Sequence, residues 1–271
     1  MAEKKNSGMS PSRSDICRFV DQIYNNSPLK REKFRWLRQL LPQDLSGKEL
    51  VDIGGDSGVI SYKLRELGGT WTSADLIDTA VESIRSVVGE RVFKLEEGKL
   101  PLADNSMDYV LIVDMLEHLE DDVGFLRETL RVLRNDGELI VNVPNPKEGA
   151  LRRFRFWIGQ TDEAHGHLRP GYTLEQLETL LSKDFQIIEA KSYSRLFTQL
   201  IDTIINAGLS LLKAGKGGAK GKLVTATTFQ QSKKNAFLLT VLGPIFSVAL
   251  FLDALLPCTH GGMLIVKARK I

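Results

Sequence analysis

The residues whose types and spacing suggest chemistry begin with the run VDIGGDSG, from Val51 to Gly58. A strand-like apolar stretch, Glu49 to Ile53, leads into this run, and helical spacing from Val59 to Leu67 follows it. Glycines let the backbone turn sharply and approach a ligand closely. The N-terminus of the following helix offers free backbone N–H groups, which bind polar or negatively charged groups. The run therefore predicts a ligand pocket at the end of a strand.

A glycine-rich turn alone does not identify the ligand, because phosphate loops, dehydrogenases and ordinary strand-to-helix connections also contain one. The dehydrogenase form requires the spacing G-x-G-x-x-G. Here the glycines are Gly54, Gly55 and Gly58, and the acidic residue Asp52 stands two positions before the first of them. That arrangement fits a dinucleotide pyrophosphate poorly.

Length and composition narrow the class of protein that could contain such a pocket. With 271 residues, of which 42% are hydrophobic and 26% charged, the chain can bury one core with an appendage. Cys17 and Cys258 stand at opposite ends, away from histidines at metal spacing, which predicts neither a disulfide framework nor a metal site. Residues 1–14 are polar and lack the apolar segment of a secretory signal. We expect a disordered tail and a cytoplasmic protein.

Charge is divided unevenly along the chain, although the net charge is only +2. Residues 1–150 carry 20 Lys and Arg against 26 Asp and Glu, a net of −6, and residues 151–271 carry 16 against 8, a net of +8. An acidic half and a basic half indicate two surfaces with different partners. The alternative is that the basic residues only solubilise a hydrophobic half.

Strand and helix patterns alternate through the first half of the chain, which predicts a parallel sheet with helices on both faces and ligands at the carboxyl ends of the strands. The later segment from Thr173 is a capping box followed by a helix to Leu181. The apolar run from Met263 to Val266 indicates a last strand that is buried on both faces. The expected strands are 49–53, 70–74, 92–95, 109–113, 138–143, 185–190 and 263–268, and the expected helices include 15–41, 59–67, 79–88 and 121–133.

The glycine turn, Asp75 and the segment LPLADNSMDYV, which runs from Leu100 to Val110, together resemble class I S-adenosylmethionine-dependent methyltransferases, closest to the small-molecule group that includes the quinone-biosynthesis enzymes. The resemblance covers roughly residues 50–190 and the last strand. The first motif of that family usually reads D-x-G-x-G-x-G, and Asp56 replaces its middle glycine here. The resemblance implies an enzyme that uses S-adenosyl-L-methionine and no metal.

The same resemblance implies the architecture: an α/β, Rossmann-like, mixed seven-stranded sheet with helices on both faces and an antiparallel last strand. The apolar and basic residues of 196–258 add a hydrophobic helical insertion before that strand. The expected division of the chain is a tail at 1–14, a methyltransferase core at 15–195, the insertion at 196–258 and the last core strand at 259–271.

The cofactor contacts are likewise implied by the resemblance. Asp75 would accept hydrogen bonds from both ribose hydroxyls, and its alternative is a helix N-cap. Glu96 would lie near the adenine amino group, or else be a solvated carboxylate, and Leu100 would flank the adenine. The whole predicted set is Asp52, Gly54, Gly55, Asp56, Gly58, Asp75, Leu76, Glu96, Leu100, Asp114 and Met115.

Methyl transfer is an in-line displacement, so the protein must position the acceptor, exclude water and, for a hydroxyl acceptor, remove a proton. Histidine is the natural base near neutral pH. His118 follows the fourth strand, and His165 and His167 stand in AHGHLRPGYT, where the family builds its acceptor lid. The alternatives are that Glu117 and His118 only cap the next helix and that the other two histidines occupy a surface loop.

The C-terminal half combines basic and apolar residues in a pattern typical of membrane interfaces. The run RRFRFW at 152–157 precedes an amphipathic segment at 196–212, a loop that contains Lys213, Lys216, Lys220 and Lys222, and an apolar run at 236–252. Each apolar segment is shorter than the ~20 residues that a membrane span needs, and one crossing would separate the last strand from its sheet. We expect a hairpin in the interface of an anionic membrane, with a lid or a homodimer contact as the alternative.

A lipophilic acceptor fits this layout: a quinone precursor, a polyprenyl-linked molecule or a glycolipid, reached from the inner face of the membrane. A soluble small molecule is the alternative acceptor. Asp56 in the cofactor turn leaves open a function of another class, a catalytically inactive scaffold or regulatory protein at the membrane. A nucleic-acid partner is not expected, because the basic residues alternate with aliphatic ones and no target-base motif is present.

Overall fold

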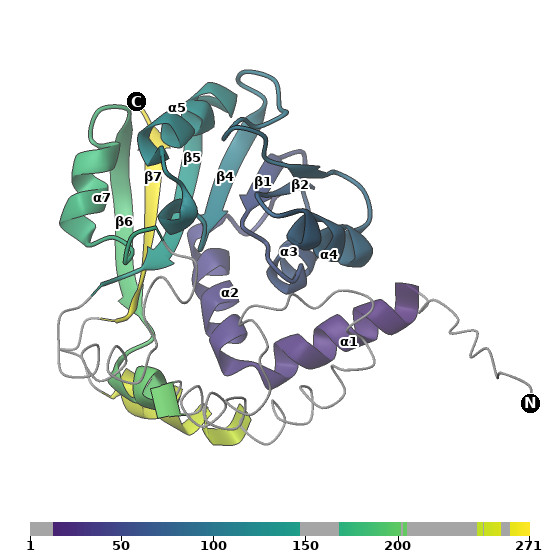
Figure 1. The fold of residues 1–271 in the computed structure, drawn as a ribbon, viewed down its shortest axis with the longest axis vertical. Helices are drawn as coiled ribbons and strands as arrows, with labels where there is room; N and C mark the ends of the chain where they lie inside the picture. The colour runs from purple at the N-terminus through teal and green to yellow at the C-terminus, as the bar shows by residue number, and fades with distance from the viewer. Residues whose placement is uncertain (1–12, 147–167, 202, 205–242, 246, 256–260) are drawn as a thin grey trace, which may run out of the picture.

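The computed structural model describes residues 13–146, 168–201, 203–204, 243–245, 247–255 and 261–271. A sheet with the strand order β3-β2-β1-β4-β5-β7-β6 forms its centre (Figure 1). The strands are β1 (Glu49–Ile53), β2 (Thr70–Asp75), β3 (Val92–Lys94), β4 (Met107–Val113), β5 (Leu133–Pro144), β6 (Phe185–Tyr193) and β7 (Met263–Lys270). The helices are α1 (Arg13–Asn26), α2 (Pro28–Leu40), α3 (Val59–Arg65), α4 (Asp78–Val88), the 3-10 helix η1 (Leu116–His118), α5 (Asp122–Val132) and α7 (Leu174–Leu181).

The sheet confirms the predicted mixed seven-stranded architecture. Strands β1 to β5 pair in parallel, and β7 lies antiparallel between β5 and β6. Leu264, Ile265 and Val266 of β7 are at most 3% exposed, as expected for a strand that is covered on both faces. The last strand therefore returns to the main sheet, between β5 and β6.

Side chains of one strand alternate between two cores, and this alternation explains why helices cover both faces. Val110 and Ile112 of β4 pack in a core that includes residues of α5 and α7. Leu111 and Val113, from the same strand, pack in a second core that includes residues of α2 and α3. The predicted helices on both faces are thereby confirmed.

The expected single helix over 15–41 is two helices in the structure. The side chain of Ser27 accepts a hydrogen bond from the backbone N–H of Lys30, and Pro28 takes the first position of α2. Proline suits that position because its missing N–H would have no helical partner there. The break turns α2 away from α1, and α2 runs from beyond the carboxyl ends of the strands toward the sheet (Figure 1), where Leu37 and Leu40 pack in the second core.

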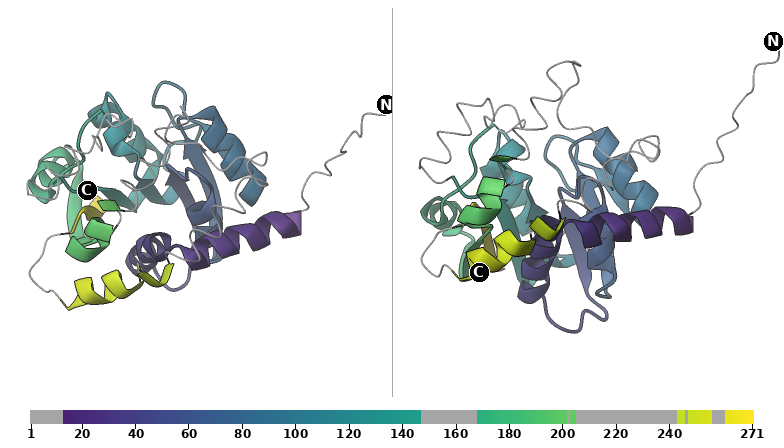
Figure 2. Two further views of the ribbon diagram at one scale, coloured as in Figure 1. Left: turned by 60° about the horizontal axis from the view of Figure 1, so that its bottom comes forward. Right: turned by 90° about the horizontal axis from the view of Figure 1, so that it is seen from below.

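Two further helical segments, at 196–204 and 243–254, come from the predicted insertion, with residues 202 and 246 outside the description. The buried carboxylate of Asp253 joins them, because it accepts hydrogen bonds from the backbone N–H groups of Phe197 at 2.8 Å and Thr198 at 3.0 Å. Arg31 of α2 donates to Ser247 at 3.4 Å. Figures 1 and 2 show both segments beyond the end of β6, beside α2. No helix among the described residues is long and apolar enough to cross a membrane.

Candidate functional site

The turn after β1 is so tightly packed that its glycines cannot carry side chains. A Cβ on Gly54 would overlap the carbonyl oxygen of Val113, and one on Gly55 would overlap the hydroxyl of Ser61. Gly54 also has a φ of 89°, which favours glycine. The predicted strand–turn–helix cradle is therefore present at the carboxyl ends of β1 and β4.

Asp56, which stands where the family usually has a glycine, has a φ of 48°. Aspartate tolerates this left-handed region better than most residues with a side chain, so the turn keeps its shape. The Asp56 side chain is exposed, and its backbone N–H points to Asp75, 3.3 Å from the Oδ2 atom.

Asp75 ends β2 with only 5% of its surface exposed. Its two carboxylate oxygens accept hydrogen bonds from the backbone N–H groups of Asp56 at 3.3 Å and Ile77 at 3.2 Å. Burial raises the pKa of this carboxyl, and the backbone hydrogen bonds oppose that shift. Each carboxylate oxygen can accept a second donor, so the group suits a ligand that carries two hydroxyls.

Asp52 is buried behind the turn. Its carboxylate accepts hydrogen bonds from the hydroxyls of Ser61 and Ser73, the latter at 2.8 Å, and Arg65 lies 3.5 Å away. Burial raises its pKa, and the charge of Arg65 acts in the opposite direction. The residue thus holds β1, β2 and α3 together beneath the predicted pocket. Asp52 would therefore affect a ligand only by holding the glycine turn in place.

The remaining predicted cofactor residues surround this cradle with different exposure. Leu76 is half-buried, Leu100 is buried, and Glu96 is exposed and pairs through its backbone with Lys99. Met115 is buried and lies directly under Gly54.

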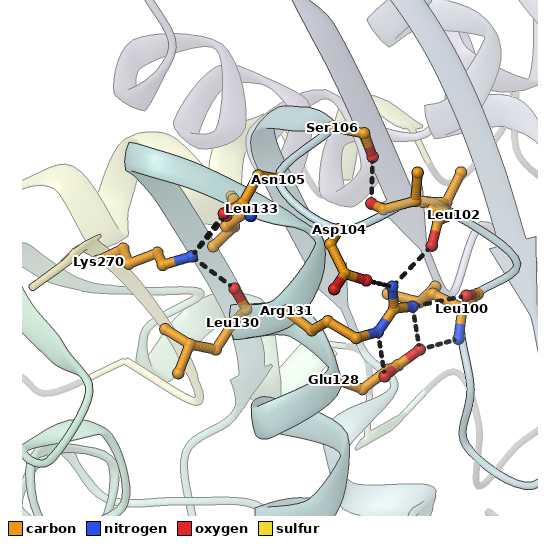
Figure 3. Close-up of polar contacts among 11 residues, drawn as sticks. Leu100, Leu102, Asp104, Asn105, Ser106, Glu128, Leu130, Arg131, Leu133 and Lys270 are labelled. Atoms are coloured by element: carbon orange, nitrogen blue, oxygen red, sulfur yellow. Dashed lines mark hydrogen bonds and ion pairs between the residues drawn. The ribbon is translucent and has the colours of Figure 1, made fainter.

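Arg131 fixes the loop that carries Leu100, a role that the sequence did not predict (Figure 3). Its guanidinium donates to the backbone oxygens of Leu100 at 3.1 Å and Leu102 at 2.9 Å. Glu128, one turn earlier on α5, binds Arg131 at 2.6 Å and accepts the N–H of Leu100 at 2.8 Å. The hydrogen bond from Arg131 lowers the pKa of Glu128.

Beyond β4, Asp114 has both carboxylate oxygens engaged. One oxygen accepts the side-chain amide of Asn142 at 2.6 Å, and the other forms an ion pair with Lys33 of α2. Asn142 is fixed in turn by the hydroxyl of Tyr193, which donates to its side-chain oxygen at 2.6 Å. Asp114 is therefore held as a charged, oriented group at the carboxyl end of β4, beside the glycine turn.

Glu117, three residues further along, has the opposite environment. Its side chain is fully buried, and neither carboxylate oxygen has a hydrogen-bond partner among the described residues. Burial raises its pKa to about 8, Asp114 adds to the shift and Lys33 opposes it. Glu117 therefore keeps its proton near neutral pH. His118, the next residue, is half-buried.

Helix α2 brings two lysines to the site, and the sequence alone gave no sign of them. Lys33 pairs with Asp114, and Lys30 lies one helical turn earlier. Burial lowers the pKa of Lys30, whereas the charges of Asp56 and Asp114 raise it. The site thus contains cations of α2 and carboxylates of the strand ends in close proximity.

His165 and His167 lie outside the described residues. The segment that follows them is attached to η1 and α5: Leu168 donates its N–H to the carbonyl of Glu117 at 3.1 Å, and Arg169 donates to the carbonyl of Leu119 at 2.7 Å. The predicted acceptor segment therefore ends beside Glu117. No group of three His, Cys, Asp or Glu side chains within the described part of the chain is arranged to hold a metal ion.

Comparisons with known proteins agree with this geometry. Residues 51–141 match the family described as "Methyltransferase domain". A Mycobacterium tuberculosis protein described as a probable S-adenosylmethionine-dependent methyltransferase is 40% identical over 108 residues, which are 40% of this chain and 39% of that protein. Demethylmenaquinone methyltransferase of Tropheryma whipplei is 25% identical over 143 residues, which are 51% and 55% of the two chains. The chain thus spans about half, or less, of these relatives.

Among solved structures, phosphoethanolamine N-methyltransferase 2 of Haemonchus contortus, in complex with S-adenosyl-L-methionine, superposes with a TM-score of 0.55. The match covers 96% of this chain and 57% of that one at 18% identity, so it concerns the fold alone.

Proposed function

We propose that this chain, whose residues 51–141 match a methyltransferase domain, transfers a methyl group from S-adenosylmethionine to a lipophilic acceptor presented at a membrane surface. The proposal is carried by one observation, the position of the insertion. The segments 196–204 and 243–254 lie beyond the carboxyl end of β6 (Figure 1). The glycine turn follows the carboxyl end of β1, on the same side of the sheet. An acceptor bound at the insertion would approach the cofactor site from the carboxyl ends of the strands.

The residues of the cradle fit S-adenosylmethionine. The glycine turn leaves room for close backbone approach, and the carboxylate of Asp75 would accept the ribose hydroxyls. Leu76 and Leu100 would flank the adenine, with Glu96 at its rim. When bound, this cofactor supplies an electrophilic methyl group on a sulfonium.

The lysines of α2 supply a counter-charge for the carboxylate of the cofactor's methionine part. Lys30 and Lys33 stand one turn apart and lie close to Asp56 and Asp114. The carboxylate of a bound cofactor would form ion pairs with these two lysines, and the cofactor's ammonium group would then face the two aspartates. On this arrangement Asp56 favours binding rather than opposing it.

The insertion also presents an exposed apolar face, which we assign to contact with an anionic membrane. The exposed fractions of Val248 and Phe251 are 59% and 64%, which is unusual for apolar side chains of this size. Arg31 and Arg35 of α2 are exposed on the helix beside them, so cations border the apolar face. The large apolar side chains exposed on the insertion are Leu196, Leu200, Ile204, Ile245, Val248, Phe251 and Leu255.

Calorimetry with S-adenosylhomocysteine tests the cofactor site. We expect one binding site per chain, and we expect Asp75→Asn to weaken binding at least 10-fold, because it removes a charged acceptor from two hydroxyls. Asp78→Asn is the matched control, since Asp78 is an exposed carboxylate three residues away. Absence of binding to the folded wild-type protein would favour the scaffold function instead.

Co-sedimentation with vesicles that contain phosphatidylglycerol tests the membrane contact. Val248→Ser combined with Phe251→Ser should reduce the bound fraction strongly, whereas Val123→Ser should not, because Val123 is 43% exposed on α5, outside the insertion. Equal sedimentation of all variants would contradict the assignment and leave the soluble acceptor.

A further inference from the structure

Glu117 lies where three parts of the site meet. It belongs to η1, immediately beyond the carboxyl end of β4. Its carboxyl group interacts electrostatically with Lys33 of α2. Its backbone carbonyl accepts the N–H of Leu168, where the predicted acceptor segment rejoins the described chain.

A fully buried carboxyl group without a hydrogen-bond partner needs a reason, because burying an unsatisfied polar group costs free energy. Glu117 has no such partner at either oxygen among the described residues, although Lys33 and Asn142 are both engaged by Asp114 only three positions away. The two carboxyl groups thus differ in what they can do. Asp114 is an oriented anion, whereas neither oxygen of Glu117 is hydrogen-bonded to another described residue.

We infer that the carboxylate of Glu117 accepts the proton of a hydroxyl group on the methyl acceptor, an inference that rests on the proposed methyltransferase function. The O–H bond of the acceptor breaks and its proton binds a Glu117 oxygen. The electron pair left on the acceptor oxygen forms the bond to the methyl group, whose bond to sulfur breaks with its pair going to sulfur. The inference commits the acceptor to a hydroxyl group acidic enough for a carboxylate base, which is that of a phenol or an enol.

The electrostatics of the site are consistent with this role. A general base works best when its pKa is near the working pH, and burial together with Asp114 raises the pKa of Glu117 to about 8, so the ionised fraction that can accept a proton grows as the pH approaches 8. Two neighbouring carboxyl groups in different environments are a common way to separate a fixed charge from a proton acceptor.

Two probe acceptors separate proton removal from positioning. One is a phenol that stays protonated at the assay pH, and the other is a nitrophenol that is already ionised there. With labelled S-adenosylmethionine, Glu117→Gln should lower the rate with the phenol about 100-fold or more and lower it with the ionised nitrophenol less than about 3-fold. Glu120→Gln, which changes an exposed side chain nearby, should leave both rates unchanged.

Infrared spectroscopy of the protein without added cofactor gives a second readout. The difference between the wild-type protein and Glu117→Gln should contain the band of a protonated carboxyl group that disappears with a midpoint near pH 8. If Glu117→Gln does not fold, Glu117→Asp takes its place: the shorter side chain keeps the group but retracts it, so the rate with the phenol should fall more than the rate with the nitrophenol.

The outcomes distinguish this inference from the proposed function. Equal losses with both probes, or methylation of neither phenol by a wild-type protein that binds S-adenosylhomocysteine, would each overturn the role of Glu117 alone. Failure of the folded wild-type protein to bind S-adenosylhomocysteine would instead overturn the methyltransferase function.

Discussion

The buried acid Glu117 should make the stability of this protein depend on pH in a way that one substitution removes. In the unfolded chain the group ionises near its ordinary pKa of 4.5, whereas in the folded protein it ionises at about 8. The folded-state pKa is raised, so the stabilisation is fully present below pH 4.5 and is lost as the pH rises through 8. Ionisation at high pH therefore works against folding.

The size of the effect follows from the same values. Between about pH 6 and about pH 8 the unfolded chain carries the charge while the folded protein largely keeps the proton. Each pH unit of this window lowers the free energy of unfolding by about 1.4 kcal/mol, with a smaller loss near the midpoint. The contribution of Glu117 should fall by about 2 to 3 kcal/mol across these two units.

Urea denaturation of the wild-type protein and Glu117→Gln at both pH values measures this contribution as a difference of differences, so that other titrating groups cancel. The wild-type protein should lose about 2 to 3 kcal/mol more than the variant between the two pH values. Glu120→Gln, with its exposed side chain, should behave like the wild-type protein. Parallel pH dependences for the wild-type protein and Glu117→Gln would refute the conclusion that Glu117 is buried with its proton.

Further variants test the turn, the lysines and the loop clamp. Gly54→Ala should cost about 1–3 kcal/mol more than Gly68→Ala in urea denaturation, because both glycines have similar positive φ values but only the first has no room for a Cβ. Lys33→Gln should weaken the binding of S-adenosylhomocysteine about 10-fold in calorimetry. The binding of 5′-methylthioadenosine, which lacks the carboxylate, should stay unchanged, and equal losses of affinity for both ligands would show that Lys33 does not bind the carboxylate. Arg131→Met should lower the free energy of unfolding by about 1–3 kcal/mol and weaken cofactor binding, unlike Arg127→Met on the exposed face of α5.

The sheet could be predicted because its signals are local. The strand Glu49–Ile53 has the predicted bounds, and the capping box at Thr173 begins α7 with both of its reciprocal hydrogen bonds. The break at Ser27 was missed, although a serine followed by a proline is a signal for a helix start. The overall apolar periodicity of 15–41 concealed that signal.

The residues of the site were predictable only where their positions follow from a local sequence pattern. Gly54 and Asp75 follow from their places at strand ends, and the structure brings them to one cradle. Lys33 was not predictable, because its partner Asp114 is 81 residues away in the sequence. The burial of Glu117 likewise depends on packing between distant segments, so the sequence could not separate a residue beside the methyl group from a helix cap.

Methyl transfer to a membrane-presented acceptor can be measured as transfer of label from methyl-labelled S-adenosylmethionine to a lipid extract in vesicles. We expect a labelled product in the lipid fraction with the wild-type protein and loss of that product with Asp75→Asn. Label that appears only in water-soluble molecules, or no label from a folded protein that binds the cofactor, would contradict this expectation.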